Sequence, residues 1–157
     1  MSNVDFARKL VKGKIAETIF SQMFRESGNF TVLEFGYEKV IPEMIQQGFN
    51  ENNPMIETLR TAPDFAVIDR DTRQVKLIEV KYQRILNPVY TLKAANRMRK
   101  SWNPSYLFIA TSNGFFMDEI ANIISNNGRI APLNHPKINI ELQNDYLEIL
   151  RNFEQDN

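Results

Sequence analysis

A predicted β-hairpin between residues 64 and 82 constrains the fold of this chain more than any other feature. Asp64–Asp69 and Val75–Tyr82 are mostly apolar and include β-branched residues, as strands do. The polar segment Arg70–Gln74 lies between them and favours a turn. We therefore expect two antiparallel strands joined by a short turn. The side chains that indicate a function lie where these strands end.

The position of the turn sets which residues of the two strands face each other. With Asp71 and Thr72 as the central turn residues, Asp64 lies directly opposite Glu79. Opposed residues have Cβ atoms about 4.5–5.5 Å apart, so the two carboxylates repel each other unless a cation or a proton sits between them. Side chains alternate faces along a strand, so Lys81 shares the face of Glu79. A turn changed by one residue would break this pairing.

Two carboxylates and an ammonium group in this arrangement can form a metal site. Mg²⁺ prefers oxygen ligands at about 2.0–2.1 Å and keeps several waters. Asp64 and Glu79 would supply two oxygens, and the Val80 carbonyl a third. Metal-bound water is a better nucleophile, and the cation offsets charge on a phosphorane-like transition state. Lys81 would orient or deprotonate that water and stabilise developing negative charge.

A simpler interpretation of Glu79 and Lys81 is a solvated cross-strand pair, because charged residues near strand ends are common. Two features favour a site instead. Pro63-Asp64 precedes the paired strand at hairpin distance, and the residues just before Glu79 are apolar apart from Lys76. Glu79 and Lys81 therefore end a strand with a buried character rather than decorate an exposed one.

A predicted helix from Val4 to Ser27, with Gly28 as its stop signal, carries one acidic residue on its apolar stripe. The stripe consists of Phe6, Leu10, Gly13, Glu17, Phe20 and Phe24. We expect it to face the core, where a carboxylate is costly unless it is paired, hydrogen-bonded or coordinated. Glu17 is therefore either a site residue or a glutamate at the helix flank, bonded to a neighbouring lysine or to backbone.

Together these motifs resemble those of the PD-(D/E)xK nuclease superfamily, which has the restriction-endonuclease-like fold. Pro63-Asp64 followed by Glu79-Val80-Lys81 is similar to the pattern that defines the superfamily. Gly13–Glu17 is similar to the first-helix segment of archaeal Holliday-junction resolvases, where a helix glutamate completes the acidic site. The resemblance covers roughly Val4 to Thr111, and residues beyond Ser112 have no clear counterpart.

The resemblance implies a role for each motif residue. It implies a catalytic set of Glu17, Asp64, Glu79 and Lys81. Asp64, Glu79 and the Val80 carbonyl would bind Mg²⁺ or Mn²⁺, and Glu17 would be an auxiliary acid able to add a ligand. The implied activity is hydrolysis of DNA phosphodiester bonds. A homodimer is an expectation of the resemblance alone, because related nucleases often dimerise.

The charge of the chain is unevenly distributed, although its formal net charge is zero. Residues 82–110 carry five basic side chains and no acidic one. Residues 111–157 carry three basic and seven acidic side chains. A basic segment directly after the candidate site is where a DNA backbone would be held.

The basic segment reads as a helix between Pro88 and Asn103. Its apolar stripe consists of Leu92, Ala95, Met98 and Trp102, and we expect Trp102 to be a core residue rather than a base-stacking platform. The candidate DNA-binding residues on another face are Lys93, Arg97 and Lys100, with Lys14 and Arg84 as further candidates. Such a face is either simply solvated or contacts DNA, and the absence of acids favours DNA.

The remaining patterns predict a single α/β domain over residues 1–157, with a core at about 4–111 and a C-terminal extension at 112–157. We expect a central mixed four-stranded sheet, flanked by helices on both faces, with extra C-terminal helices. The expected elements are a strand at Phe30–Ile41, a short helix at Met55–Arg60, a buried strand at Ser105–Thr111, a helix at Phe116–Ser125, a short strand or an extended segment at Lys137–Leu142 and a last helix at Asn144–Phe153 with Asn144 as N-cap.

Composition excludes several classes of protein. The chain has 157 residues, of which 43% are hydrophobic and 24% charged, as in a globular domain. It has no cysteine, which excludes disulfides and thiolate metal sites. No apolar run approaches the roughly 20 residues of a membrane span, and Met1–Asp5 lacks a signal-peptide pattern. We therefore expect a cytoplasmic protein that does not contact a membrane.

Two other functions stay open. The first is a nuclease-fold module that binds nucleic acid or a protein partner without cleaving, which divalent-cation binding would distinguish from an enzyme. The second is a structural protein that assembles through residues 112–157, with the site incidental. A monomer in solution would count against the second.

Overall fold

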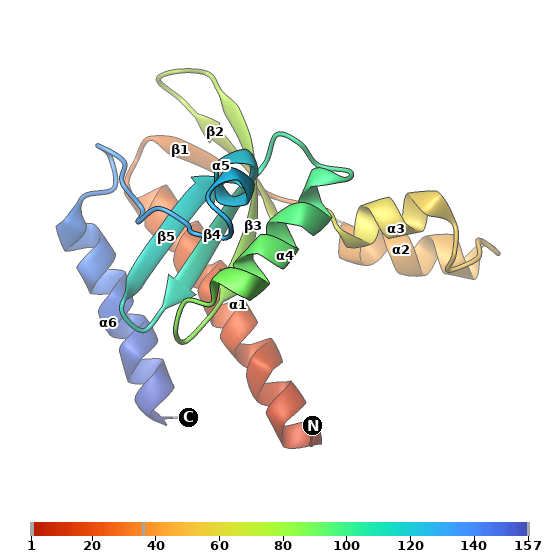
Figure 1. Cartoon of the computed structure of the whole chain (residues 1–157), viewed down its shortest axis with the longest axis horizontal. Coiled ribbons are helices and arrows are strands. Elements are labelled where there is room, and N and C mark those ends of the chain that lie inside the picture. The colour runs from red at the N-terminus through yellow and green to blue at the C-terminus, as the bar shows by residue number, and fades with distance from the viewer. Residues whose placement is uncertain (1, 36, 157) are drawn as a thin grey trace.

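The chain forms one five-stranded mixed sheet with helices on both of its faces (Figure 1). The structure is a computed structural model that describes residues 2–35 and 37–156. Its elements are α1 (Asn3–Glu26), β1 (Phe30–Glu34), α2 (Tyr37–Gln46), α3 (Pro54–Arg60), β2 (Phe65–Asp69), β3 (Val75–Tyr82), α4 (Pro88–Arg99), β4 (Tyr106–Thr111), β5 (Gly114–Glu119), α5 (Ile120–Ser125) and α6 (Ile140–Asp156). The strands follow chain order across the sheet, and only β3 and β4 pair in parallel.

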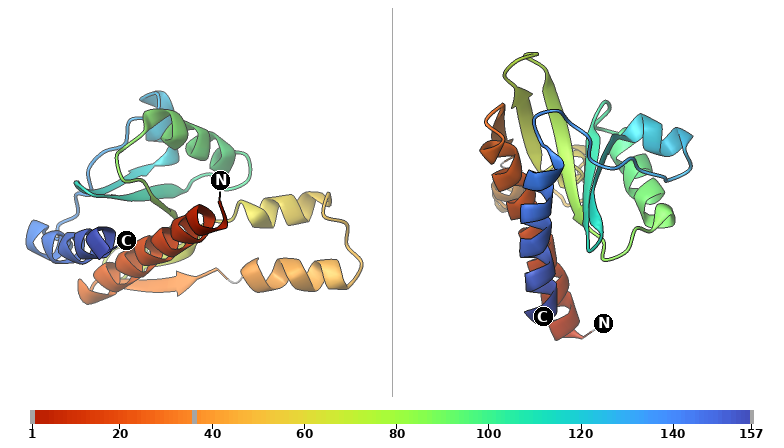
Figure 2. Two further views of the ribbon diagram at one scale, coloured as in Figure 1. Left: turned by 90° about the horizontal axis from the view of Figure 1, so that it is seen from below. Right: turned by 90° about the vertical axis from the view of Figure 1, so that its left-hand side faces the viewer.

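The sheet separates two apolar cores, and β4 contributes to both. Phe108 and Ala110 point to the face covered by α1 and α6, whereas Leu107 and Ile109 point to the face covered by α4 and α5 (Figure 2). Side chains alternate along a strand, so a strand covered on both faces is a continuous apolar run, as residues 107–110 are. The expected buried strand is therefore confirmed.

α1 packs on the sheet with only part of its length. The ring of Phe20 lies 5.0 Å from that of Phe108 and 5.1 Å from that of Phe65, and Phe24 is also buried. Phe6 and Leu10, expected on the same core-facing stripe, are 56% and 57% exposed. This expectation was wrong because α1 extends beyond the sheet at its N-terminal end, so nothing covers the first turns of the stripe (Figure 1).

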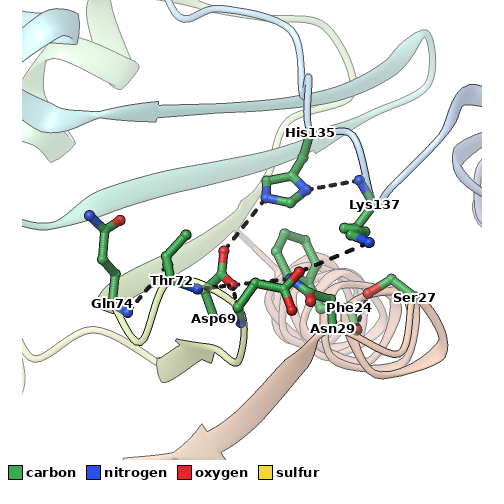
Figure 3. A network of polar contacts seen from close by, with 9 residues as sticks. Phe24, Ser27, Asn29, Asp69, Thr72, Gln74, His135 and Lys137 are labelled. Carbon is green, nitrogen blue, oxygen red and sulfur yellow. Dashed lines mark hydrogen bonds and ion pairs between the residues drawn. The ribbon is translucent and has the colours of Figure 1, made fainter.

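The hairpin has the expected register. Phe65 pairs with Ile78 and Ile68 with Val75, so the next position places Asp64 opposite Glu79. Asp69 holds the turn (Figure 3). Its carboxylate accepts hydrogen bonds from the backbone N–H groups of residues 71 and 72 at 2.9 and 3.1 Å and from the Asn29 side chain at 3.1 Å. The turn that sets the register is thus fixed at the end of the hairpin far from the candidate site.

The N-terminal strand is shorter than expected. β1 ends at Glu34, and Tyr37–Gln46 forms α2 instead of continuing the strand to Ile41. Gly36, which the expected strand included, lies outside the described residues. The apolar residues of α2 recur at spacings of three and four, at 40, 41, 44 and 45, which favours a helix over the alternation of a strand. The short helix at Met55–Arg60 is confirmed as α3, and α2 and α3 extend from the sheet as an arm (Figure 1).

A fifth strand replaces the first half of an expected helix. The turn lies at Ser112-Asn113, and Thr111 pairs with Gly114 across it, so Phe115 and the residues after it return along β4. The expected helix at Phe116–Ser125 is therefore β5 followed by the short α5. The sheet has five strands rather than four because this local turn meets a free edge of β4.

The C-terminal segment also differs from expectation. Lys137–Leu142 contains no strand beyond an isolated bridge between His135 and Ile138. α6 begins at Ile140, and its cap is Asn139, whose side-chain oxygen accepts a hydrogen bond from the Leu142 N–H at 2.9 Å, rather than Asn144. Leu147 and Leu150 of α6 are buried in the same core as α1. Among the described helices, none combines the length and apolar character needed to cross a bilayer.

Candidate active site

The site forms where β3 continues past Phe65, the first residue of its partner strand β2. β2 begins at Phe65, opposite Ile78, whereas β3 runs on to Tyr82 with β4 at its other edge. Asp64 lies directly before β2, at the point where β3 loses this partner strand, and we call this point the step. Its backbone carbonyl accepts a hydrogen bond from the Phe35 N–H at 3.1 Å, and its side-chain Oδ2 accepts one from the Val80 N–H at 2.8 Å. A carboxylate therefore takes the place that a strand residue would otherwise occupy beside β3.

The carbonyl of Val80 is aimed at the same step. The Gln83 N–H donates to the Ala110 carbonyl of β4 at 3.0 Å, so odd-numbered residues in this part of β3 direct their backbone groups toward β4. Val80, at an even position, directs its N–H and C=O to the opposite edge. The backbone oxygen expected as a third metal ligand thus lies on the Asp64 side of the strand.

All four expected catalytic residues line one cleft. Glu17 reaches it from α1, Asp64 from the start of β2, and Glu79 and Lys81 from the end of β3. The cleft has a volume of about 560 Å³. Glu17 belongs to the helix on one face of the sheet and Glu79 to the other face, and the two meet because the sheet is interrupted at this step. Lys81 is exposed at the cleft, whereas the three acids are partly buried.

Two of the carboxyl groups in the cleft have raised pKa values. Burial, followed by the hydrogen bond and the charge of Glu79, raises the pKa of Asp64 to about 8, although the Val80 N–H and Lys81 oppose the shift. Burial and the negative charge of Asp64 likewise raise the pKa of Glu17. Lys14 opposes that shift, with its Nζ 3.3 Å from Glu17 Oε2. The cleft therefore concentrates more negative charge than its neighbours neutralise, and a cation or a proton would relieve it.

The donor set fits a hard divalent cation. Asp64, Glu79 and the Val80 carbonyl offer only oxygens, which suits Mg²⁺ or Mn²⁺ rather than a metal that prefers sulfur or nitrogen. Within residues 2–35 and 37–156, no group of three or more histidine, cysteine, aspartate or glutamate side chains is arranged as a complete metal-binding set. Mg²⁺ does not require such a set, because it is usually bound through one or two carboxylates and several waters.

Basic side chains also line the cleft, and we call them the basic wall. Lys93 and Arg97 of α4 line it, as does Arg60 at the end of α3. Lys93 and Arg97 also line a neighbouring groove of about 820 Å³, and Lys100 lines that groove but not the cleft. The expected basic face thus runs from the acidic step outward along α4.

The two further DNA-binding candidates lie apart from that wall. Lys14 is on α1 and pairs with Glu17. Arg84 is exposed just after β3 and does not line the cleft. The sequence reasoning missed Arg60 and Tyr90, which do line it. Tyr90 could have been found because it precedes Lys93 and Arg97 by three and seven residues, on the same helix face.

Trp102 belongs to the scaffold of the site. Its Nε1 donates a hydrogen bond to the Thr58 carbonyl at 3.0 Å, and its half-buried ring lies 5.9 Å from that of Phe35. These contacts fasten the residues after α4 to α3. Trp102 therefore sets the spacing of the two helices that carry Arg60 and Arg97, and it is not a surface platform for a base.

Comparison with known proteins does not show a family for this chain. No protein-family model matches the chain, and no curated protein matches it. The resemblance to PD-(D/E)xK nucleases therefore rests on the residues of the sequence motifs alone.

Proposed function

We propose that this protein is a metal-dependent nuclease that hydrolyses DNA phosphodiester bonds, on a restriction-endonuclease-like fold. The observation that supports the proposal most is the convergence of Glu17, Asp64, Glu79 and Lys81 in one cleft that basic side chains also line. The hairpin register brings Asp64 opposite Glu79, but Glu17 is far from both in the sequence and reaches the cleft only through the packing of α1 on the sheet.

Each side chain has a role in such a reaction. Asp64, Glu79 and the Val80 carbonyl would hold a Mg²⁺ or Mn²⁺ ion, which would supply an activated water and offset charge on the phosphate. Lys81 would orient the attacking water, and its ammonium group would stabilise the negative charge that develops on the phosphate oxygens. Glu17 would act as the auxiliary acid that reaches the same cleft from α1.

The basic wall positions the substrate. Lys93, Arg97 and Arg60 line the same cleft as the acids and would neutralise the phosphates that flank the reacting one. These contacts are sequence-independent, because a phosphate backbone carries the same charge at every nucleotide. The proposal therefore includes DNA binding without assigning base-specific readout to these residues.

A plasmid-nicking assay tests the proposal. We expect the wild-type protein to nick supercoiled plasmid with Mg²⁺ or Mn²⁺ and not with EDTA. Asp64→Asn and Lys81→Ala should each lower the rate by at least about 100-fold, the usual contribution of one charge-stabilising or proton-transferring group. Lys137→Ala is the matched control, because Lys137 is an exposed lysine in the C-terminal loop that lies 3.9 Å from Asp71 at the far end of the hairpin.

The outcomes separate the alternatives. A wild-type protein that cleaves no plasmid, linear, branched or single-stranded DNA with either metal would refute the nuclease. If that protein still bound DNA, it would be a nuclease-fold binding module. Cleavage that persists in both Asp64→Asn and Lys81→Ala would show that the reaction uses a different site.

A further inference from the structure

Three strongly exposed apolar side chains stand together at the connection between β3 and α4. Ile85, Val89 and Tyr90 are 73%, 75% and 64% exposed, and they are the most exposed large apolar side chains among the described residues. We call them the β3–α4 tip. Single exposed apolar residues are ordinary, but three within six positions mark a surface that contacts something.

The backbone of the β3–α4 tip is held in place. The Gln83 side chain accepts a hydrogen bond from the Asn87 N–H at 2.9 Å and donates one to the buried Thr91 hydroxyl at 3.3 Å. The Asn87 side chain caps α4 by accepting from the N–H groups of Val89 and Tyr90 at 3.1 and 3.4 Å. The exposed side chains therefore project from a fixed framework, which lowers the entropy cost of binding through them.

The tip borders the candidate active site and has cations beside it. Tyr90 lines the cleft together with Lys93 and Arg97, and Val89 lines the neighbouring groove beside the same two cations. Residues 82–110 contain no acidic side chain, so the acids of the cleft and the groove belong to other segments of the chain. An apolar surface whose own segment carries only cations is complementary to a polyanion that also offers apolar faces. Nucleic acid has both properties, since its bases have apolar faces and its backbone carries phosphates.

We infer that the β3–α4 tip takes an unpaired nucleobase, with Tyr90 as its stacking platform, and that the preferred substrate has a single-stranded segment next to the reacting phosphate. The inference rests on the proposed function and specifies its substrate class. In a continuous duplex the base faces are covered by their neighbours, so an exposed tyrosine beside the cleft gains little from it. An unpaired base leaves its face free for Tyr90 while Lys93 and Arg97 hold the adjoining phosphates.

Binding without cleavage tests this inference. The full-length protein in EDTA is titrated into fluorescein-labelled DNA at one fixed salt concentration, as a single strand, a blunt duplex of the same sequence and a duplex with a single-stranded tail. We expect the single strand and the tailed duplex to bind at least about tenfold more tightly than the blunt duplex, as stacking of one or two bases allows. Tyr90→Ala should weaken single-strand binding roughly five- to 100-fold, whereas Tyr90→Phe should keep it.

Two further measurements make the result specific. A 2-aminopurine base in the single strand should be quenched on binding to the wild type and to Tyr90→Phe, but not to Tyr90→Ala. Val75→Ala is the matched control, because Val75 is 61% exposed at the hairpin end of the same β3 strand, away from the cleft. It should match the wild type in affinity and in quenching.

The contrary results are equally clear. Equal affinity for the blunt duplex and the single strand, or unchanged binding by Tyr90→Ala, would overturn the inference. Metal-dependent nicking of plasmid would in that case leave the proposed nuclease standing. Absence of binding to every DNA form would also overturn the inference, and the plasmid-nicking assay with Mg²⁺ or Mn²⁺ would then decide separately on the proposed nuclease.

Discussion

The backbone N–H of Val80 donates a hydrogen bond of 2.8 Å to Oδ2 of Asp64, at the point where β2 no longer pairs with β3. One carboxylate oxygen of Asp64 thereby accepts the hydrogen bond of a backbone N–H that no longer has a partner in β2. The Asp64 carboxyl group also interacts with Glu79 and Glu17 in the cleft. This hydrogen bond thus links the hairpin register, the point where β2 stops pairing with β3, and the position of the acidic site. A change at Asp64 should affect both the fold and the chemistry.

The stability of the metal-free protein should depend on pH through Asp64. Burial and the neighbouring Glu79 raise its pKa from 3.8 to about 8, so the folded state holds the proton more tightly than the unfolded chain. The resulting stabilisation is complete below about pH 4 and is lost as the pH rises through about 8. We expect the free energy of unfolding in EDTA, measured with urea, to fall over this interval.

Two comparisons assign that pH dependence. Asp64→Asn removes the titrating group while keeping the shape of the side chain, so its unfolding free energy should change less over the same pH range. Addition of Mg²⁺ to the wild type should restore stability most at the alkaline end, because the cation replaces the proton between the carboxylates. An identical pH profile for the wild type and Asp64→Asn would contradict the raised pKa.

The sequence predicted the parts of this site that depend on local rules. The opposition of Asp64 and Glu79 follows from a turn of defined length and from side-chain alternation, both of which the printed sequence contains. Glu17 was identified because a carboxylate on an apolar helix stripe is costly unless it is paired, hydrogen-bonded or coordinated. Arg60 was not, because its approach to the cleft depends on how α3 packs beside α4. The helix pattern likewise could not show that Phe6 lies beyond the sheet it was expected to cover.

β5 illustrates the same limit in the sheet. Residues 116–125 have helical spacing, and this spacing does not show that their first half pairs with β4. The pairing arises because the tight turn before Gly114 brings Phe115 and Phe116 back along a strand with a free edge. Phe115 then packs against Phe108, with ring centroids 5.6 Å apart. Tertiary contact therefore overrode the periodicity, as it often does in short segments.

Gly128→Ala should destabilise the protein and disturb α4. A Cβ built on Gly128 would lie 2.1 Å from the Pro88 carbonyl oxygen, a backbone atom at the start of α4 that cannot move aside alone. Gly128 also has φ of 94°, where an alanine costs roughly 1–3 kcal/mol. We expect a loss of unfolding free energy beyond that range, together with weaker single-strand DNA binding because Pro88 precedes Val89 and Tyr90.

Gly48→Ala is the matched control for that experiment. Gly48 has φ of 93°, and a Cβ added to it would meet no atom of the described residues within 4 Å, so the variant carries the backbone cost without the clash. The difference between the two variants in the free energy of unfolding, measured with urea, gives the energetic cost of the clash with the Pro88 carbonyl. Equal losses of unfolding free energy in the two variants would show that the close approach of Gly128 to Pro88 adds nothing to the backbone cost.

Glu154→Ala should loosen the attachment of α6 to the sheet. The Glu154 carboxylate accepts hydrogen bonds from the Tyr82 hydroxyl at the end of β3 and from the Ser112 hydroxyl, the latter at 2.6 Å. Both donors are partly buried and would lose this acceptor, at a cost of roughly 1–3 kcal/mol each when unsatisfied. Glu148→Ala, an exposed acid on the same helix, should change the unfolding free energy by less than about 0.5 kcal/mol. Equal stability of the two variants would exclude a role for the Tyr82 contact.

The basic residues of α4 should differ in how they contribute to DNA binding. Lys93 and Arg97 line both the cleft and the neighbouring groove, whereas Lys100 lines the groove alone. Each lost phosphate contact reduces the slope of log affinity against log salt by about 0.7–0.9. Lys93→Ala and Arg97→Ala should each show that reduction and also slow plasmid nicking, because they hold phosphates beside the reacting bond.

Lys100→Ala reports on the path of the strand. If the DNA leaves the cleft along the groove, this variant should lose about the same slope as Lys93→Ala while its nicking rate at saturating DNA stays at the wild-type value. Arg129→Ala, an exposed cation that lines neither the cleft nor the groove, is the control and should match the wild type in both measurements. An unchanged salt slope for Lys100→Ala would show that the strand does not leave the cleft along the groove.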